Sequence, residues 1–230
     1  MRKLLLSSAI FAAVASVSFT GQAADTATLG ITGKITPAAC NVSLSAASID
    51  LGNIPASTLT DQANIKKGDD VVLSVNCDTA SATAIQTTDN RASSAMTISE
   101  MAEQMGMGIG QGYTDAYVFG LGNDSAQSKI GALTLGISSA TADGAADSNV
   151  LVSTDKATWG ASALKSPSGT PLERDAYFAL ASDADTTAPA ALTTSTYTIT
   201  SGILLKKGSS YPSGEEVNID GNVTFSVVYL

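Results

Sequence analysis

The side chains that could carry out catalysis are few in this chain of 230 residues, which has no histidine and two cysteines. Without histidine, a nucleophilic triad with an imidazole base is excluded, and a metal site would need carboxylate ligands alone. Carboxylate pairs such as Asp183/Asp185 and Glu100/Glu103 have the residue types for acid–base catalysis. In so acidic and loop-rich a chain these pairs are expected to be solvated. We therefore predict a protein that is not an enzyme and holds no cofactor or metal.

The first 23 residues have the pattern of a secretory signal peptide. Arg2 and Lys3 precede an apolar run from Leu4 to Phe19, and small residues lead to a cleavage point after Ala23. The run is interrupted by serines and is shorter than the roughly 20 residues of a membrane-spanning helix, which favours export over a membrane anchor. Removal of the peptide leaves ten of the 12 basic residues against 21 acidic ones. This negative charge argues against nucleic acid as a partner.

The two cysteines, Cys40 and Cys77, predict one disulfide. An exported chain folds in an oxidising compartment, and neither cysteine has another thiol to pair with. The bond would close a loop of about 37 residues and contribute about 4 kcal/mol to stability in the chain-entropy description.

The elements that must position these residues begin with an alternating stretch at the start of the mature chain, residues 24–36. Ala27, Leu29, Ile31, Gly33 and Ile35 fall on one side, and mostly polar residues fall on the other. This period of two predicts a strand with one apolar face. No turn signal follows that would fold it into a hairpin with the next strand, so another surface has to receive it.

The remainder of the chain predicts short strands separated by clusters of Gly, Asn, Asp, Ser and Pro, which is typical of an all-β sandwich. Thr97 and Glu100 form a capping box before Ile98, Met101 and Met105, which predicts a short surface helix that ends at Gly106. Two insertions are predicted at residues 95–112 and 139–171, and residues 139–187 should be mostly loops. The predicted strands cover residues 40–44, 48–51, 71–77, 82–87, 116–121, 129–137, 150–153, 176–180, 193–205 and 221–230.

The last of these strands alternates Val223, Phe225, Val227 and Tyr229. Together with the signal peptide, the free strand before the first cysteine and the segment IDLGNIP between the cysteines, it resembles the pilus subunits of the bacterial chaperone–usher pathway. Members of that family have an immunoglobulin-like sandwich without its final strand. Each subunit lends its N-terminal extension to fill the groove of a neighbour, a form of strand addition to a sheet edge.

The resemblance implies roles for both ends of the chain. Residues 24–36 would be the donor-strand extension, and residues 37–230 an incomplete immunoglobulin-like sandwich with a short helical insertion. In the extension, Gly33, Ile31 and Leu29 would fill successive pockets of the neighbour's groove, and Ala27 stands where the family usually has glycine. At the other end, Phe225, Val227 and Tyr229 would border the groove and contact a periplasmic chaperone. The family's glycine about fourteen residues from the end is replaced by Val217.

The function implied by the resemblance is structural. The chain would be a subunit of a surface fimbria that supports adhesion, delivered by the periplasmic chaperone to an outer-membrane usher and polymerised by donor-strand exchange. Its expected partners are neighbouring pilus subunits, the chaperone and the usher, and its expected location is the bacterial cell surface, reached through the periplasm. The sequence identifies no host-surface receptor.

A second interpretation is an exported carbohydrate-binding adhesin that does not polymerise. Trp159, Tyr113, Tyr117 and Tyr211 could stack on sugar rings. Aromatic residues make up only 5% of the chain, however. A tip adhesin of the resembling family also usually has a lectin domain in place of the N-terminal extension, so the sequence favours a subunit of the shaft.

Overall fold

The computed structural model of the chain describes residues 27–36, 38–107, 112–147, 149–162, 169–181 and 187–230. The chain divides into two compact units, of which the first ends at Thr36 and the second begins at Pro37. The predicted signal peptide lies outside the described residues, as do Asp183 and Asp185. None of the helices in the described ranges is long and apolar enough to cross a membrane.

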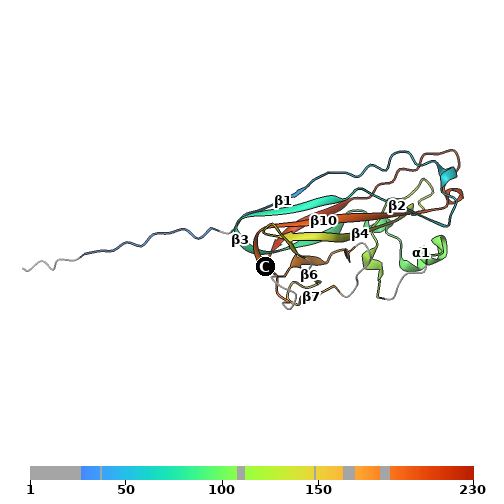
Figure 1. Cartoon of the computed structure of the whole chain (residues 1–230). Helices are drawn as coiled ribbons and strands as arrows, with labels where there is room; N and C mark the ends of the chain where they lie inside the picture. The colour runs from blue at the N-terminus through green and yellow to red at the C-terminus, as the bar shows by residue number, and fades with distance from the viewer. Residues whose placement is uncertain (1–26, 37, 108–111, 148, 163–168, 182–186) are drawn as a thin grey trace, which may run out of the picture. The chain divides into compact units, whose positions relative to one another are not determined.

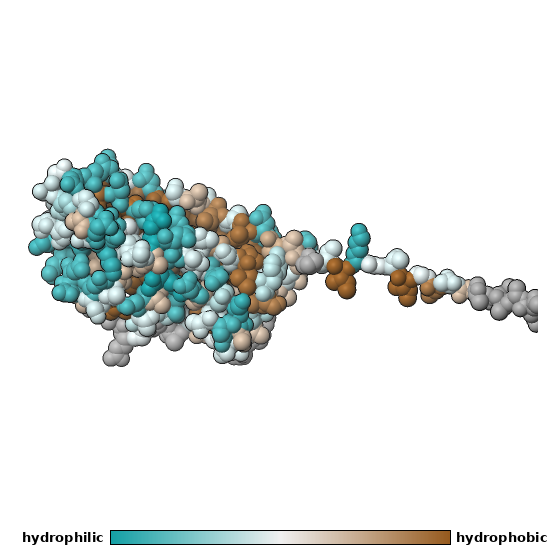
Figure 2. Space-filling view, turned by 180° about the vertical axis from the view of Figure 1, so that it is seen from behind, coloured by the Kyte–Doolittle hydropathy of each residue, from teal (hydrophilic) through white to brown (hydrophobic). Residues whose placement is uncertain are grey.

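Residues 27–36 of the first unit form neither helix nor strand, and each of them is exposed. Leu29, Ile31 and Ile35 have 87%, 91% and 103% of their surface open to solvent. Figure 2 shows hydrophobic side chains along this segment separated by paler ones. The predicted strand is thus absent here, because a strand exists only where a second strand supplies hydrogen-bond partners.

The second unit is mostly β-sheet and sandwich-like, which confirms the all-β prediction. One α-helix, α1 (Ile98–Met105), is described in it, together with short 3₁₀ turns. Its strands are β1 (Cys40–Leu44), β2 (Ala63–Lys67), β3 (Val71–Asp89), β4 (Gly131–Ala142), β5 (Ala145–Asp147), β6 (Val150–Ser153), β7 (Gly160–Ala161), β8 (Thr170–Pro171), β9 (Tyr177–Leu180), β10 (Ala191–Lys206) and β11 (Val223–Tyr229).

The long strand β3 joins the two layers of the unit. Its first half pairs antiparallel with β1 on one side and β10 on the other, and β10 continues the layer to β4 and β2. Its second half pairs with β11 on one side and β9 on the other, and β9 continues to β6 and β7. Figure 1 shows β10 and β4 side by side, with β6 and β7 beneath them. The sequence predicted two separate strands here, at 71–77 and 82–87, but the chain runs through both.

The main core lies between the two layers. It is formed by alternate residues of β3, β4 and β10, with the buried rings of Phe119 and Phe178. Phe178 packs edge-on against Tyr197, with 5.3 Å between the ring centroids. Every second residue of these strands faces this core, which is why they read as period-two segments in the sequence.

Helix α1 covers the opposite face of β4 and β10, and the prediction of this helix is confirmed. The Thr97 side chain accepts from the Glu100 N–H, the Glu100 carboxylate accepts from the Thr97 N–H, and Gly106 ends the helix in a left-handed conformation. A second apolar cluster lies beneath it, formed by Met96, Met101, Met105, Val118, Ala132 and Leu204.

Several predicted elements are wrong. Residues 48–51 form no strand, because no strand lies beside them to pair with. Residues 116–121 are also not a strand: a 3₁₀ turn, Asp115–Tyr117, is followed only by a single bridge between Phe119 and Leu133. Conversely, β2 was not predicted, since its NIKK sequence is polar and only its pairing with β10 makes it a strand. The region predicted to be mostly loops contains the short strands β5, β7 and β8 as well as β6 and β9.

Candidate functional site

The predicted disulfide between Cys40 and Cys77 is formed, and it joins β1 to β3. The Cα atoms of the two cysteines are 4.0 Å apart. This short distance is typical of a residue pair in antiparallel strands that does not exchange backbone hydrogen bonds. The N–H and C=O groups of Cys40 therefore face away from β3. The bond therefore holds β1 in the sheet while one edge of β1 stays open.

The outer edge of β1 carries the backbone groups of every second residue. Asp78 N–H donates to Ala39 O and Ser45 N–H donates to Val72 O, so the odd-numbered residues face β3. The N–H and C=O groups of Cys40, Val42 and Leu44 consequently point outward. In the part of the chain that the structure describes, β1 pairs with β3 alone.

Strand β11 has an open edge of the same kind. Leu230 N–H donates to Ala82 O, and Asn90 N–H donates to Asn222 O, so the even-numbered residues bond to β3. The backbone groups of Val223, Phe225, Val227 and Tyr229 therefore point outward. Over the described ranges this strand, too, pairs only with β3.

The two open edges lie on the same side of β3. Its other side is taken by β10 and β9, whose ends are joined by a bridge between Ala181 and Pro189. An apolar cavity of about 220 Å³ opens between the edges, and we call it the edge groove. Leu44, Ile49 and Leu51 line one wall, Ile219, Val223 and Phe225 line the other, and the floor consists of Val71, Leu121, Leu133, Leu135, Ile199, Ser201 and Ile203.

The walls of the edge groove are incompletely buried. Leu44 has 40% of its surface exposed, and Val223, Phe225 and Val227 are half-buried although they contact the main core. Figure 2 shows hydrophobic side chains open to solvent on the surface of this unit. Leaving such side chains in water forgoes part of the roughly 1.5–3 kcal/mol that full burial of a large apolar side chain provides.

The edge groove continues past Ile219 into a second cavity of about 640 Å³, which shares Ile49, Leu51 and Ile219 with the first. Val217 lines this second cavity and is half-buried against the core. Gly221 lines the edge groove itself, and an added Cβ there would lie 3.1 Å from Leu121 Cδ2. A side chain at residue 221 would therefore require Leu121 to shift by a few tenths of an ångström.

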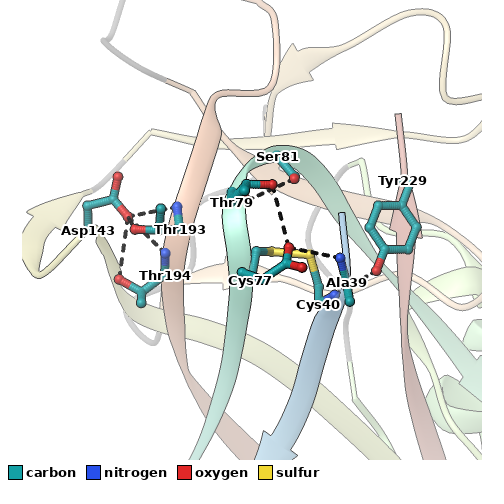
Figure 3. The surroundings of a disulfide bond; sticks show 10 residues. Ala39, Cys40, Cys77, Thr79, Ser81, Asp143, Thr193, Thr194 and Tyr229 are labelled. Atoms are coloured by element: carbon teal, nitrogen blue, oxygen red, sulfur yellow. Dashed lines mark hydrogen bonds between the residues drawn. A yellow bond between two sulfur atoms is a disulfide. The ribbon is translucent and has the colours of Figure 1, made fainter. Parts of the chain in front are cut away.

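Beyond the other end of the edge groove, a hydrogen bond joins β1 and β11, the strands that carry parts of its two walls. Cys40 N–H donates to the phenol oxygen of Tyr229 at 2.7 Å, and Figure 3 shows the phenol pointing at the backbone of Cys40. Beside it, Ala39 N–H donates to the Asp78 carboxylate at 3.0 Å. These contacts fix the residues at which the second unit begins.

The structure thus brings together one half of the predicted site. Cys40, Cys77, Phe225, Val227 and Tyr229 all lie on the strands that border the edge groove. The other half, Ala27, Leu29, Ile31 and Gly33, lies in the first unit, where these residues are exposed.

Sequence reasoning did not identify the wall formed by Leu44, Ile49 and Leu51, or the floor from β4 and β10. The alternation of Ile49 and Leu51 in the sequence was interpreted as a strand. In the structure these side chains line the edge groove.

The aromatic residues considered for sugar stacking do not share one cavity. Tyr113 and Tyr117 contact each other edge-on beside α1, whereas Tyr211 lines the second cavity of the groove. Tyr117 donates its hydroxyl to the Glu173 carboxylate at 2.6 Å, and burial together with this bond raises the pKa of the phenol. Tyr211 donates to Ile130 O, and burial raises its pKa to about 12.

The carboxylate pair that the structure describes has a structural role. The Glu100 carboxylate accepts from Lys129 at 2.7 Å as well as from the Thr97 N–H, and both contacts lower the pKa of Glu100. Glu103 is exposed on the same helix. No group of three or more potential metal ligands occurs among the described residues.

Comparison with known protein families adds little to this geometry. The model of a family described as a protein of unknown function, DUF1120, matches residues 29–134, which is less than half of the chain. The match begins in the exposed segment and includes β1, β2, β3 and α1. A search of curated proteins finds no match.

Proposed function

We propose that the chain is a structural subunit of a surface fimbria that polymerises by donor-strand exchange and supports adhesion. A periplasmic chaperone would deliver it to an outer-membrane usher. The observation that carries the proposal is that one chain contains both an apolar groove between two open strand edges and an exposed segment with alternating apolar residues. The groove lacks a strand between its two edges, and the exposed segment lacks a strand to pair with. The segment of one copy has the apolar pattern of a strand that would fill the groove of a second copy.

The two features match in length and period. Ala27 to Ile35 is nine residues long, as is Val217 to Phe225, which runs from the second cavity along one wall of the edge groove. An added strand of this length would span about 30 Å at the usual rise per residue. Its apolar face would meet the floor while its backbone met the outward N–H and C=O groups of β11.

The energetics favour tight association. Burial of Leu29 and Ile31, which are now almost fully exposed, is worth roughly 1.5–3 kcal/mol each. Each backbone hydrogen bond made to an open edge adds about 0.5–1.5 kcal/mol net. Gly33 has open space around it and no left-handed backbone, so nothing within the first unit requires glycine at this position. A tight fit of the added strand inside a groove would explain why residue 33 is a glycine.

The same edge would serve the chaperone earlier in assembly. Phe225 and Val227 are half-buried and Tyr229 is 50% exposed, so their outward faces are accessible to a strand from another protein. Before polymerisation such a strand would cover the groove. A charged residue in place of Phe225 should therefore abolish the chaperone complex and lead to degradation of the subunit.

The experiment uses two neighbouring positions of the extension. Ile31→Asp would place a carboxylate in the groove of the next subunit, at a cost of several kcal/mol, whereas Thr32→Asp would place it on the solvent side of the added strand. We expect Ile31→Asp to give soluble, chaperone-bound subunit without fibres in electron micrographs, and Thr32→Asp to give normal fibres.

Normal polymerisation of Ile31→Asp would contradict the proposal. The same holds if the mature chain is a stable monomer with no affinity for a peptide covering residues 24–36. In either case a carbohydrate-binding module that does not polymerise would become the better interpretation.

A further inference from the structure

Just beyond the edge groove lies a contact that polymerisation alone does not require. Tyr229 is the last residue of β11, and its phenol reaches across to β1, where it accepts from the Cys40 N–H at 2.7 Å. The ring is half exposed, so it contributes less to the core than a buried aromatic residue would. What the phenol does is connect the two walls of the groove (Figure 3).

The bond uses a backbone group that would otherwise be open to an added strand. Cys40 is in a close pair with Cys77, so its N–H faces outward, as the N–H groups of Val42 and Leu44 do. The phenol oxygen of Tyr229 accepts from the first of these three N–H groups, that of Cys40. A strand lying between the walls cannot pair with Cys40 while the bond is present.

The cavity itself ends before this bond. Phe225 on β11 and Leu44 on β1 line it, but Val227 and Tyr229 do not, and neither do Cys40 and Val42. The walls therefore converge over the last residues of β11, and the Tyr229–Cys40 contact is the point at which they meet.

We propose that Tyr229 is a register stop, which limits how far an added strand can pair along β11. This inference rests on the proposed function, because it concerns the strand that would fill the groove. Pairing would use the outward groups of Val223 and Phe225 and end before Tyr229. Because side chains alternate with a period of two, a strand held at this limit presents one fixed set of side chains to the floor.

Hydrogen exchange at single-residue resolution in fibres of the full mature chain tests the inference, because it does not depend on the direction in which the added strand runs. In wild-type fibres we expect the amides of Val223 and Phe225 to exchange at least about tenfold more slowly than the amide of Tyr229. In fibres of Tyr229→Phe, which keeps the ring but loses the acceptor, slow exchange should extend to residue 229. Tyr113→Phe removes a phenol oxygen outside the groove and should leave the boundary unchanged.

The outcomes separate the two proposals. Fast exchange at Val223 and Phe225 in wild-type fibres would contradict strand addition itself. Slow exchange at all three residues of the wild-type chain would overturn the register stop and leave the proposed function intact. An unchanged boundary in Tyr229→Phe fibres would show that another residue sets it. Should that variant fail to assemble, fast exchange of the Tyr229 amide in wild-type fibres would still support a stop before residue 229, and slow exchange there would overturn it.

Discussion

The two faces of the layer formed by β4 and β10 carry similar apolar side chains but have different covers. On one face, Ala132 and Leu204 lie beneath α1, whose Met101 and Met105 are each 2% exposed. On the other face, Leu133 and Ile203 lie on the floor of the edge groove. Adjacent residues of the same strands thus face a covered surface and an open one.

This difference shows which apolar face of the β4–β10 layer a single chain can cover with its own residues. The connection from β3 to β4 includes residues 95–107, which supply a helix with a cap at each end that covers one face. No described segment of the second unit covers the groove in this way, and its walls remain partly exposed. The covered face is complete in the single chain, whereas under the proposed function the open face would be completed by assembly.

The largest effect is expected from loss of the disulfide, because the bond holds one wall of the open face. In the double variant Cys40→Ser/Cys77→Ser, release of a loop with a sequence separation of 37 residues should cost about 4 kcal/mol in the free energy of unfolding. Urea denaturation of the mature chain measures this loss, and the yield from the periplasm should fall sharply.

Hydrogen exchange shows where that damage lies. Amides of β1 should exchange faster in the double variant, while amides of α1 should keep their wild-type rates under native conditions. Equal losses at both places would mean that the two faces are one cooperative unit and that the comparison does not hold.

A second test compares one apolar side chain from each face. Met101→Ala should destabilise the chain by about 2–5 kcal/mol, since it leaves a cavity beneath α1. Leu44→Ala should cost less than about 1 kcal/mol in the single chain, because Leu44 is 40% exposed. Thermal and urea unfolding measure both values. If the two substitutions cost the same, the edge groove is filled in the single chain.

The elements that the sequence predicted correctly are those whose signals are local. The capping box at Thr97 and Glu100 satisfies its own helix end, and the alternation at the start of β3 and in the middle of β10 reports one buried face of each strand. Period-two alternation reports burial, however, and not pairing. Residues 48–51 have the alternation and line a groove, whereas β2 lacks it and is a strand because β10 lies beside it.

The candidate site was only half predictable for a related reason. The disulfide and β11 are visible as residue types and as a pattern near the end of the chain. The floor of the groove is not visible in this way, because Leu133, Leu135, Ile199 and Ile203 have the same sequence pattern as fully covered core residues. Whether a core face is covered depends on the path of the whole chain, which no local pattern contains.

A smaller effect is expected from the helix cap that holds the cover in place. Thr97→Ala removes the acceptor for the Glu100 N–H, which lies at 3.1 Å from the Thr97 hydroxyl, and should cost about 1 kcal/mol. Ser99→Ala, at an exposed position in the first turn of the same helix, is the matched control. Urea denaturation measures both variants. A cost for Thr97→Ala no greater than that of the control would mean that packing alone holds α1 over its face.

The smallest expected effect is a difference in acid sensitivity between the two faces. The side chain of Lys129 donates to the Glu100 carboxylate, and together with the Thr97 N–H this lowers the pKa of Glu100 below its ordinary value. A carboxyl group with a lowered folded pKa contributes stability above its unfolded pKa, near 4.3, and that contribution is lost as the pH falls through the folded value. Because both side chains are partly exposed, at 26% and 32%, the contribution should stay below about 1 kcal/mol.

The effect can be isolated by comparing the wild type with Glu100→Gln, since other carboxylates titrate equally in both. The difference in unfolding free energy between them should be constant from pH 7 to about pH 5 and shrink as the pH falls below the unfolded pKa of the carboxyl group and through its lowered folded pKa. The edge groove is lined by no titratable side chain among its described residues, so binding of a strand there should lack this dependence on Glu100. If the difference in unfolding free energy between the wild type and Glu100→Gln does not change with pH, the ion pair does not stabilise the covered face. A peptide affinity that follows the titration of Glu100 would show instead that the two faces are coupled through β4 and β10.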